Sequence, residues 1–252
     1  MRRKIIAGNW KMNKDLTEST SLVQEIIQKN KSFNCEVYVA PAFPFLNEVS
    51  LFSSSSQIKV LAQNVSNKSS GALTGEVSID MLKSINIESV IIGHSERRKL
   101  FGEDDITLKM KLENCFKNNM EVFFCIGETL DMREKGIQND VIENQLKNTL
   151  FDLNNVNLEK LVIAYEPVWA IGTGVNANSD QVQEIHCHIR NLLNLRYGKE
   201  SSDLIPIIYG GSLKPDNSSN IFNCSDVDGG LVGGASLNSQ TFVDIINSIY
   251  LF

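Results

Sequence analysis

The sequence repeats one pattern along its length: a short run rich in valine and isoleucine, followed by a stretch with helical character. Most of the runs are almost continuously hydrophobic, as is typical of parallel strands covered on both faces. Successive runs begin about 20 to 45 residues apart, which suits units of one strand, one loop and one helix. Repetition of this unit predicts an α/β fold, a closed (β/α)₈ barrel with helices outside. The runs lie at residues 4–8, 36–40, 58–63, 89–93, 122–126, 161–165, 206–209 and 227–232.

The stretches between these runs carry apolar residues at intervals of three and four, as amphipathic helices do. Asp15, Ser179 and Asn238 are suited to begin helices, because their side chains can accept hydrogen bonds from the first free backbone N–H groups. The serine-rich stretch 52–57 is too short for a domain linker. We therefore expect one domain over residues 1–252, a length that barrels of this type commonly occupy.

Charge and composition limit the possible partners. The formal net charge is -6, whereas nucleic acids and anionic membranes call for a basic face, so we expect neither partner. The first residues lack the apolar run of a signal peptide, and no apolar run reaches transmembrane length. The five cysteines are widely spaced without a CxxC pair, which indicates reduced thiols and a cytoplasmic protein.

In a barrel of this type the loops after the carboxyl ends of the strands form the site. Asn9 and Lys11 follow the first run, His94 follows the fourth, and Glu166 follows the sixth. The seventh and eighth runs end in the glycine pairs 210–211 and 233–234, which leave backbone amides uncovered. Such amides beside a helix N-terminus suit a phosphate group, although either pair alone is equally typical of a tight turn.

The loop after the sixth run combines a carboxylate with a segment that can move. Pro167 biases Glu166 toward extended backbone, and the apolar residues 168–171 are costly to expose unless they sometimes cover something. Gly172 and Gly174 follow them and can turn sharply. This order predicts a base beneath a lid that closes over a small ligand.

Five separated segments resemble the triosephosphate isomerase family and occur in that family's order: residues 8–13, 93–98, 125–128, 165–174 and 209–212. The resemblance runs the length of the chain. It implies a TIM barrel that interconverts dihydroxyacetone phosphate and D-glyceraldehyde 3-phosphate through an enediolate, in glycolysis and gluconeogenesis. It also implies a triose phosphate as the small-molecule substrate, with no cofactor and no metal.

The resemblance assigns catalytic roles residue by residue. Glu166 is expected to move a proton between C1 and C2, and a neutral His94 to polarise the carbonyl and shuttle protons between the substrate oxygens. The helix that starts at Ser95 disfavours protonation of the His94 ring. Lys11 is expected to supply a fixed positive charge, and Asn9 a hydrogen bond, near the enediolate oxygens.

Further residues are assigned to binding and support in the same way. Glu96 and Arg98 are expected to hold the catalytic groups in place, and Tyr209 and Ser212 to hold the closed lid. Phosphate is expected to bind to backbone amides at four positions: Gly172, Ser212, Gly233 and Gly234.

The loop 64–76 is expected to insert into a second subunit, with Thr74 touching the neighbouring site, so that the active form is a homodimer. Residues 175–177 depart from the basic and small residues usual after the lid in this family, which leaves the effect of this hinge open.

Two other enzymatic functions and one non-enzymatic function are compatible with a phosphate-binding barrel. A Schiff-base aldolase needs a lysine inside a strand, whereas Lys4 and Lys59 lie near the wrong ends of theirs. A metal-dependent epimerase needs clustered histidines and carboxylates, and the three histidines of the chain are too few. His186 and His188 do not share a helix face, so a metal pair there is not expected. A phosphate-binding protein without activity is disfavoured because Lys11, His94 and Glu166 are all present, and Cys125 is expected to be a buried small residue rather than a nucleophile.

Overall fold

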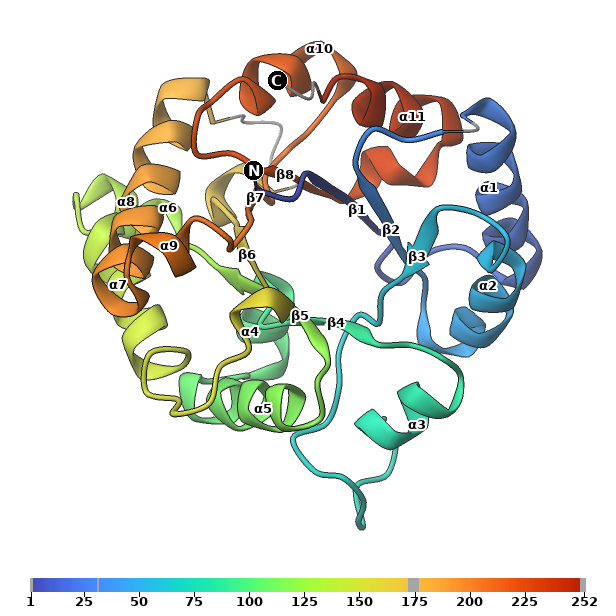
Figure 1. Cartoon of the computed structure of the whole chain (residues 1–252), viewed down its shortest axis with the longest axis horizontal. Helices are drawn as coiled ribbons and strands as arrows, with labels where there is room; N and C mark the ends of the chain where they lie inside the picture. The colour runs from blue at the N-terminus through green and yellow to red at the C-terminus, as the bar shows by residue number, and fades with distance from the viewer. Residues whose placement is uncertain (1, 31, 172–176, 250–252) are drawn as a thin grey trace.

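The computed structural model describes residues 2–30, 32–171 and 177–249. Parallel strands form the centre, in the order β3-β2-β1-β8-β7-β6-β5-β4, and an isolated parallel bridge joins Ala62, just after β3, to Val90 in β4. The first strand therefore pairs with the last, and the barrel is nearly closed, as Figure 1 shows. The predicted (β/α)₈ fold is confirmed. The strands are β1 (Ile5–Asn9), β2 (Glu36–Ala40), β3 (Ile58–Val60), β4 (Ser89–Ile92), β5 (Glu121–Ile126), β6 (Leu161–Tyr165), β7 (Ile207–Tyr209) and β8 (Gly229–Val232).

Helices surround this barrel on its outer side (Figure 1). Short 3₁₀ turns complete several of the connections: η1 (Phe43–Phe45), η2 (Leu158–Lys160), η3 (Val168–Ala170) and η4 (Gly234–Leu237). The α-helices are α1 (Leu16–Lys29), α2 (Leu46–Ser53), α3 (Ile79–Ser84), α4 (Ser95–Phe101), α5 (Asp105–Lys117), α6 (Leu130–Glu134), α7 (Gln138–Asn148), α8 (Ser179–Tyr197), α9 (Lys199–Ser202), α10 (Pro215–Phe222) and α11 (Ser239–Asn247).

The strands are hydrophobic without interruption because both of their faces are buried. Alternate residues such as Ile5, Tyr38 and Phe123 fill the barrel, and the residues between them pack beneath the helices. Cys125 belongs to the inner set and is fully buried, as the sequence predicts. Within the described ranges no helix has the length and apolarity that a membrane span requires.

Two of the three predicted helix caps are confirmed, and one is wrong by a residue. Asp15 caps α1 and Asn238 caps α11 through their side chains. The prediction for Ser179 fails, because α8 already begins at Ser179 and Asn178 is the cap. Asn178 Oδ1 accepts the Gln181 N–H at 2.8 Å, and Gln181 Oε1 accepts the Asn178 N–H at 3.1 Å. This reciprocal pair fixes where the helix starts.

The two lysines considered for an aldolase lie at the opposite end of the barrel from the loops that follow the strands. Lys4 Nζ donates to the carbonyl of Val227 at 3.0 Å, just before β8. Lys59 Nζ donates to Glu36 at 2.8 Å, at the first residue of β2. Neither ammonium lines the cavity described below.

Candidate active site

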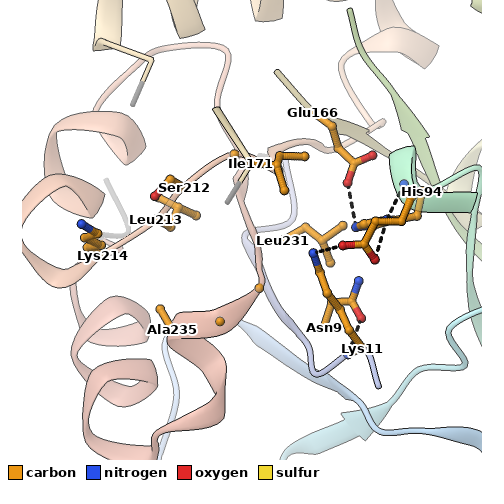
Figure 2. A pocket seen from close by; sticks show the side chains of 15 residues that line it. Asn9, Lys11, His94, Glu166, Ile171, Ser212, Leu213, Lys214, Leu231 and Ala235 are labelled. Carbon is orange, nitrogen blue, oxygen red and sulfur yellow. Dashed lines mark hydrogen bonds and ion pairs between the residues drawn. The ribbon is translucent and has the colours of Figure 1, made fainter. Parts of the chain in front are cut away.

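A cavity of about 350 Å³ opens at the carboxyl ends of the strands. Its walls come from the loops that follow β1, β4, β6, β7 and β8 (Figure 2). At one end lie Asn9, Lys11, His94 and Glu166; at the other lies Ser212. The fold therefore gathers side chains from distant parts of the chain around a space that suits a small molecule. Its lining also includes Glu96, Ile171, Gly210, Gly211, Leu213, Lys214, Leu231, Gly233, Gly234 and Ala235.

Glu166 directly follows β6, and 2% of its surface is exposed. Its Oε2 accepts the backbone N–H of Ser95 at 2.8 Å, and its Oε1 lies 3.0 Å from His94 Nε2. Among the described residues Oε1 accepts no hydrogen bond. Burial raises the pKa of Glu166, and His94, Ser95 and Lys11 partly offset that rise. The carboxyl group is thus a stronger base than one in water.

His94 caps helix α4, and this contact fixes the position of its proton. The His94 Nδ1 accepts the backbone N–H of Glu96 at 3.2 Å. Because Nδ1 is the acceptor, the neutral ring carries its hydrogen on Nε2. The ring therefore presents an N–H donor to the cavity beside Glu166.

Lys11 has a positive φ of 54°, a conformation that is uncommon for residues other than glycine. Two amides hold it there: its backbone N–H donates to Asn9 Oδ1 at 3.1 Å, and its carbonyl accepts from Gln63 Nε2 at 2.8 Å. Lys11 Nζ donates to Glu96 Oε1 at 2.5 Å. The ammonium is therefore both positioned and electrically paired at this end of the cavity.

The opposite end of the cavity is lined by backbone amides. Within the described residues, the N–H groups of Ser212, Gly233 and Gly234 donate to no acceptor. A Cβ atom on Gly233 would lie 3.7 Å from Lys11 Cε, so this end is within reach of the Lys11 side chain. Free amides next to a fixed cation suit a phosphate group. The fourth amide expected from the sequence, that of Gly172, lies outside the described residues, as do Gly174 and residues 175 and 176.

Arg98 connects the ends of two neighbouring strands. Its guanidinium donates to the carbonyl of Gly93 at 3.0 Å and to that of Cys125 at 3.2 Å, just after β4 and within β5. Asp105 accepts from the same group at 2.9 Å. Since Gly93 precedes His94, these hydrogen bonds of Arg98 hold the backbone next to the imidazole.

The first part of the predicted lid, residues 168–171, is bound to Glu128, which is fully buried. Glu128 Oε1 accepts from Trp169 Nε1 at 2.8 Å, from the Tyr165 hydroxyl at 3.0 Å and from Arg133 at 3.2 Å. Tyr165 ends β6 and Trp169 lies in η3, so one carboxylate joins the strand before Glu166 to the segment after it.

Tyr209 ends β7 and lies beside Ala177, which is the first described residue after position 171. Its ring is fully buried, and the hydroxyl faces the backbone amide of Ala177, which partly offsets the rise in its pKa caused by burial. A Cβ atom on Gly211 would lie 2.2 Å from this hydroxyl and 2.9 Å from Pro167 Cγ. Gly211 therefore makes room for the contact between the end of β7 and the start of the lid.

The predicted interface loop lies away from the cavity floor. Residues 68–76, which include Thr74, are all exposed. Figure 1 shows the segment between β3 and α3 projecting beyond the ring of helices. His186 is fully buried. Within the described residues, no three or more histidine, cysteine, aspartate or glutamate side chains lie close enough together to bind a metal ion.

Sequence reasoning did not identify several contacts at the site. The Ser95 amide on Glu166 and the two hydrogen bonds of Gln63, to Lys11 and Ala40, depend on loops that are distant in sequence. The position of Lys214, two residues after Ser212, was also not singled out.

Known proteins are similar to this chain over nearly all of its length. The sequence model of the family described as triosephosphate isomerase matches residues 4–249. The chain is 47% identical over 250 residues to the triosephosphate isomerase of Cytophaga hutchinsonii, covering 98% of this chain and 100% of that one. It is 46% identical over 250 residues to that of Chloroherpeton thalassium, with 98% and 99% covered. It is 47% identical over 247 residues to that of Clostridium tetani, with 98% and 97% covered.

Proposed function

The chain belongs to the triosephosphate isomerase family and interconverts dihydroxyacetone phosphate and glyceraldehyde 3-phosphate in glycolysis, and we propose that Glu166, His94 and Lys11 carry out this reaction. The observation that carries the assignment is the contact of 3.0 Å between Glu166 Oε1 and His94 Nε2 inside the cavity. A base and a neutral hydrogen-bond donor side by side can act on adjacent carbon and oxygen atoms of one substrate.

The proposed reaction begins when Glu166 releases the Ser95 amide and takes a proton from C1 of dihydroxyacetone phosphate. The electrons move onto the carbonyl oxygen at C2, which gives an enediolate. His94 Nε2–H donates to this oxygen, and Lys11 and Asn9 stabilise the developing negative charge. Glu166 then returns the proton to C2, and proton transfer between the oxygens through His94 completes the aldehyde.

The phosphate is proposed to bind to the amides of Ser212, Gly233 and Gly234, with Gly172 as a fourth donor. An enediolate next to a phosphate can eliminate it when water reaches the intermediate. A lid that closes over the cavity excludes water and further desolvates Glu166. Ile171 already lines the cavity, and the contacts of Glu128 and Tyr209 at either side of the lid support this role.

Replacement of Glu166 by Gln tests the assignment. The amide keeps the size of the side chain but cannot accept the proton, and a positioned general base contributes about 10² to 10⁴ in rate. We expect kcat to fall by about that factor in a coupled isomerase assay, with binding of a substrate analogue retained. Glu200→Gln, an exposed glutamate in α9, is the matched control and should keep normal kcat. Near-normal turnover of the Glu166 variant would refute the assignment.

We further propose that the protein acts as a homodimer in which Thr74 touches the partner's site. The exposed, projecting loop 68–76 supports this arrangement. Analytical ultracentrifugation combined with activity measurements tests it, and a fully active monomer would contradict it. We also propose a cytoplasmic location, which is supported by the five cysteines, none of which forms a disulfide.

A further inference from the structure

Apart from Lys214, the described side chains that line the cavity include two carboxylates and only one ammonium. Two carboxylates line it, Glu166 and Glu96, in a chain whose formal net charge is -6. Lys11 opposes them, but its ammonium is already paired with Glu96 at 2.5 Å. The carboxylates of Glu166 and Glu96 repel a doubly charged phosphate monoester as it enters, and a further cation at the phosphate end would offset this repulsion.

Lys214 is that cation. It lines the same cavity and lies near Ser212, at the end opposite Glu166 (Figure 2). Its side chain is exposed, and within the described part of the chain it forms no ion pair with a carboxylate. Its charge is therefore not cancelled by a partner in the protein, in contrast to that of Lys11.

The backbone that carries Lys214 is held in place. The Lys214 N–H donates to Asn217 Oδ1 at 2.8 Å, and Asn217 Nδ2 donates to the carbonyl of Ser212 at 3.0 Å. Pro215 follows as the first residue of α10 and fixes φ there. The Asn217 side chain thus binds the backbone of both Ser212 and Lys214. It holds the Ser212 amide, which is proposed to bind phosphate, at a fixed position relative to the backbone of Lys214.

We propose that Lys214 supplies the uncompensated positive charge that draws the phosphate group of the substrate into the cavity. This inference rests on the proposed function, because it takes the Ser212, Gly233 and Gly234 amides as the phosphate site. An exposed charge acts over about 8 Å at physiological ionic strength and is screened by salt. Lys214 is therefore expected to increase the rate at which substrate binds, which raises kcat/KM and changes kcat little.

The test compares Lys214→Gln with Lys214→Arg and with Lys199→Gln, an exposed lysine in α9 that does not line the cavity. For Lys214→Gln we expect kcat/KM for glyceraldehyde 3-phosphate to fall about three- to tenfold at low ionic strength, and to depend less on salt than in the wild type. Lys214→Arg should restore both properties, and Lys199→Gln should change neither.

D-Glyceraldehyde, which lacks the phosphate, separates this role from a structural one. Lys214→Gln should convert it as fast as the wild type does. An equal loss with both substrates, or an unchanged salt dependence with glyceraldehyde 3-phosphate, overturns the inference about Lys214. If the wild type itself fails to convert triose phosphates, it is instead the proposed function that fails.

Discussion

At the residue scale, the chemistry depends on the surroundings of one carboxyl group. Glu166 is almost completely buried, and one of its oxygens accepts a backbone N–H while the other lies 3.0 Å from Nε2 of the His94 imidazole. These two contacts fix the position of the carboxyl group. They hold the base ready while leaving it more basic than a solvated glutamate.

The raised pKa of Glu166 has a measurable consequence. The group acts as a base only when ionised, so activity is lost as the pH falls through its pKa, and burial moves that loss to a higher pH than an ordinary glutamate would give. We expect ¹³C NMR of carboxyl-labelled glutamate to show one resonance titrating above the others and missing from Glu166→Gln. A Glu166 resonance that titrates with the exposed glutamates contradicts this account.

Two glycine pairs that look alike in sequence differ in their surroundings. A Cβ atom on Gly211 would collide with the Tyr209 hydroxyl, whereas one on Gly234 would meet no atom within 4 Å. For both pairs the sequence allows uncovered amides or a tight turn. Uncovered amides suit Gly234, but at Gly211 the reason is packing between distant segments, which adjacent residues do not reveal.

At the scale of the elements, the strands could be predicted closely because burial on both faces leaves an uninterrupted apolar run. All eight predicted runs correspond to strands of the structure, and two of them match to the residue. The predicted start of α8 differs from the observed start by one residue, because Asn178 and Ser179 are both residue types that commonly cap helices. Only the reciprocal hydrogen bonds with Gln181 distinguish them, and these depend on backbone geometry.

The same alternatives can be separated by mutation. Asn178→Ala removes the side chain that caps α8 and should lower the free energy of unfolding by about 1 kcal/mol. Ser179→Ala is the matched control, because Ser179 lies within the first turn and alanine suits a helix, so stability should change little. Urea unfolding of both variants gives the two values. A larger loss for Ser179→Ala would show that the helix begins one residue later.

The sequence predicts that Asn9, Lys11, His94 and Glu166 lie close together, because the loops that follow the strands of a (β/α)₈ barrel all lie at the same end. The individual contacts do not follow from this arrangement. Glu128 binds Tyr165 and Trp169, and Gln63 binds Lys11 and Ala40, because of the register between neighbouring strands and the path of the loops. No periodicity in the sequence specifies those pairs.

At the scale of the whole molecule, stability should depend on a histidine that takes no part in the reaction. His186 is fully buried in α8, where its ring packs edge-on against Tyr165 and lies 3.2 Å from the carbonyl of Asp226. Burial lowers its pKa from the ordinary 6.5 to about 4. The folded protein therefore holds this ring neutral over a range in which the unfolded chain protonates it.

The sign of the effect follows from linkage. Above pH 6.5 the His186 ring is neutral in both the folded and the unfolded chain. As the pH falls from 6.5 toward 4, the unfolded chain binds a proton that the folded protein does not, and the free energy of unfolding decreases by about 3 kcal/mol. We expect His186→Gln to weaken the pH dependence of urea unfolding in this window. Parallel stability curves for the wild type and His186→Gln contradict the prediction.

The most direct test of the whole account is a crystal structure of the protein with 2-phosphoglycolate, whose carboxylate resembles the enediolate oxygens. We predict that its phosphate accepts hydrogen bonds from the amides of Ser212, Gly233 and Gly234. Its carboxylate should then lie within hydrogen-bond distance of His94 Nε2, with Glu166 released from Ser95 and turned toward the ligand. A ligand bound elsewhere, or bound here with Glu166 still on the Ser95 amide and out of reach of its carbon atoms, contradicts the account.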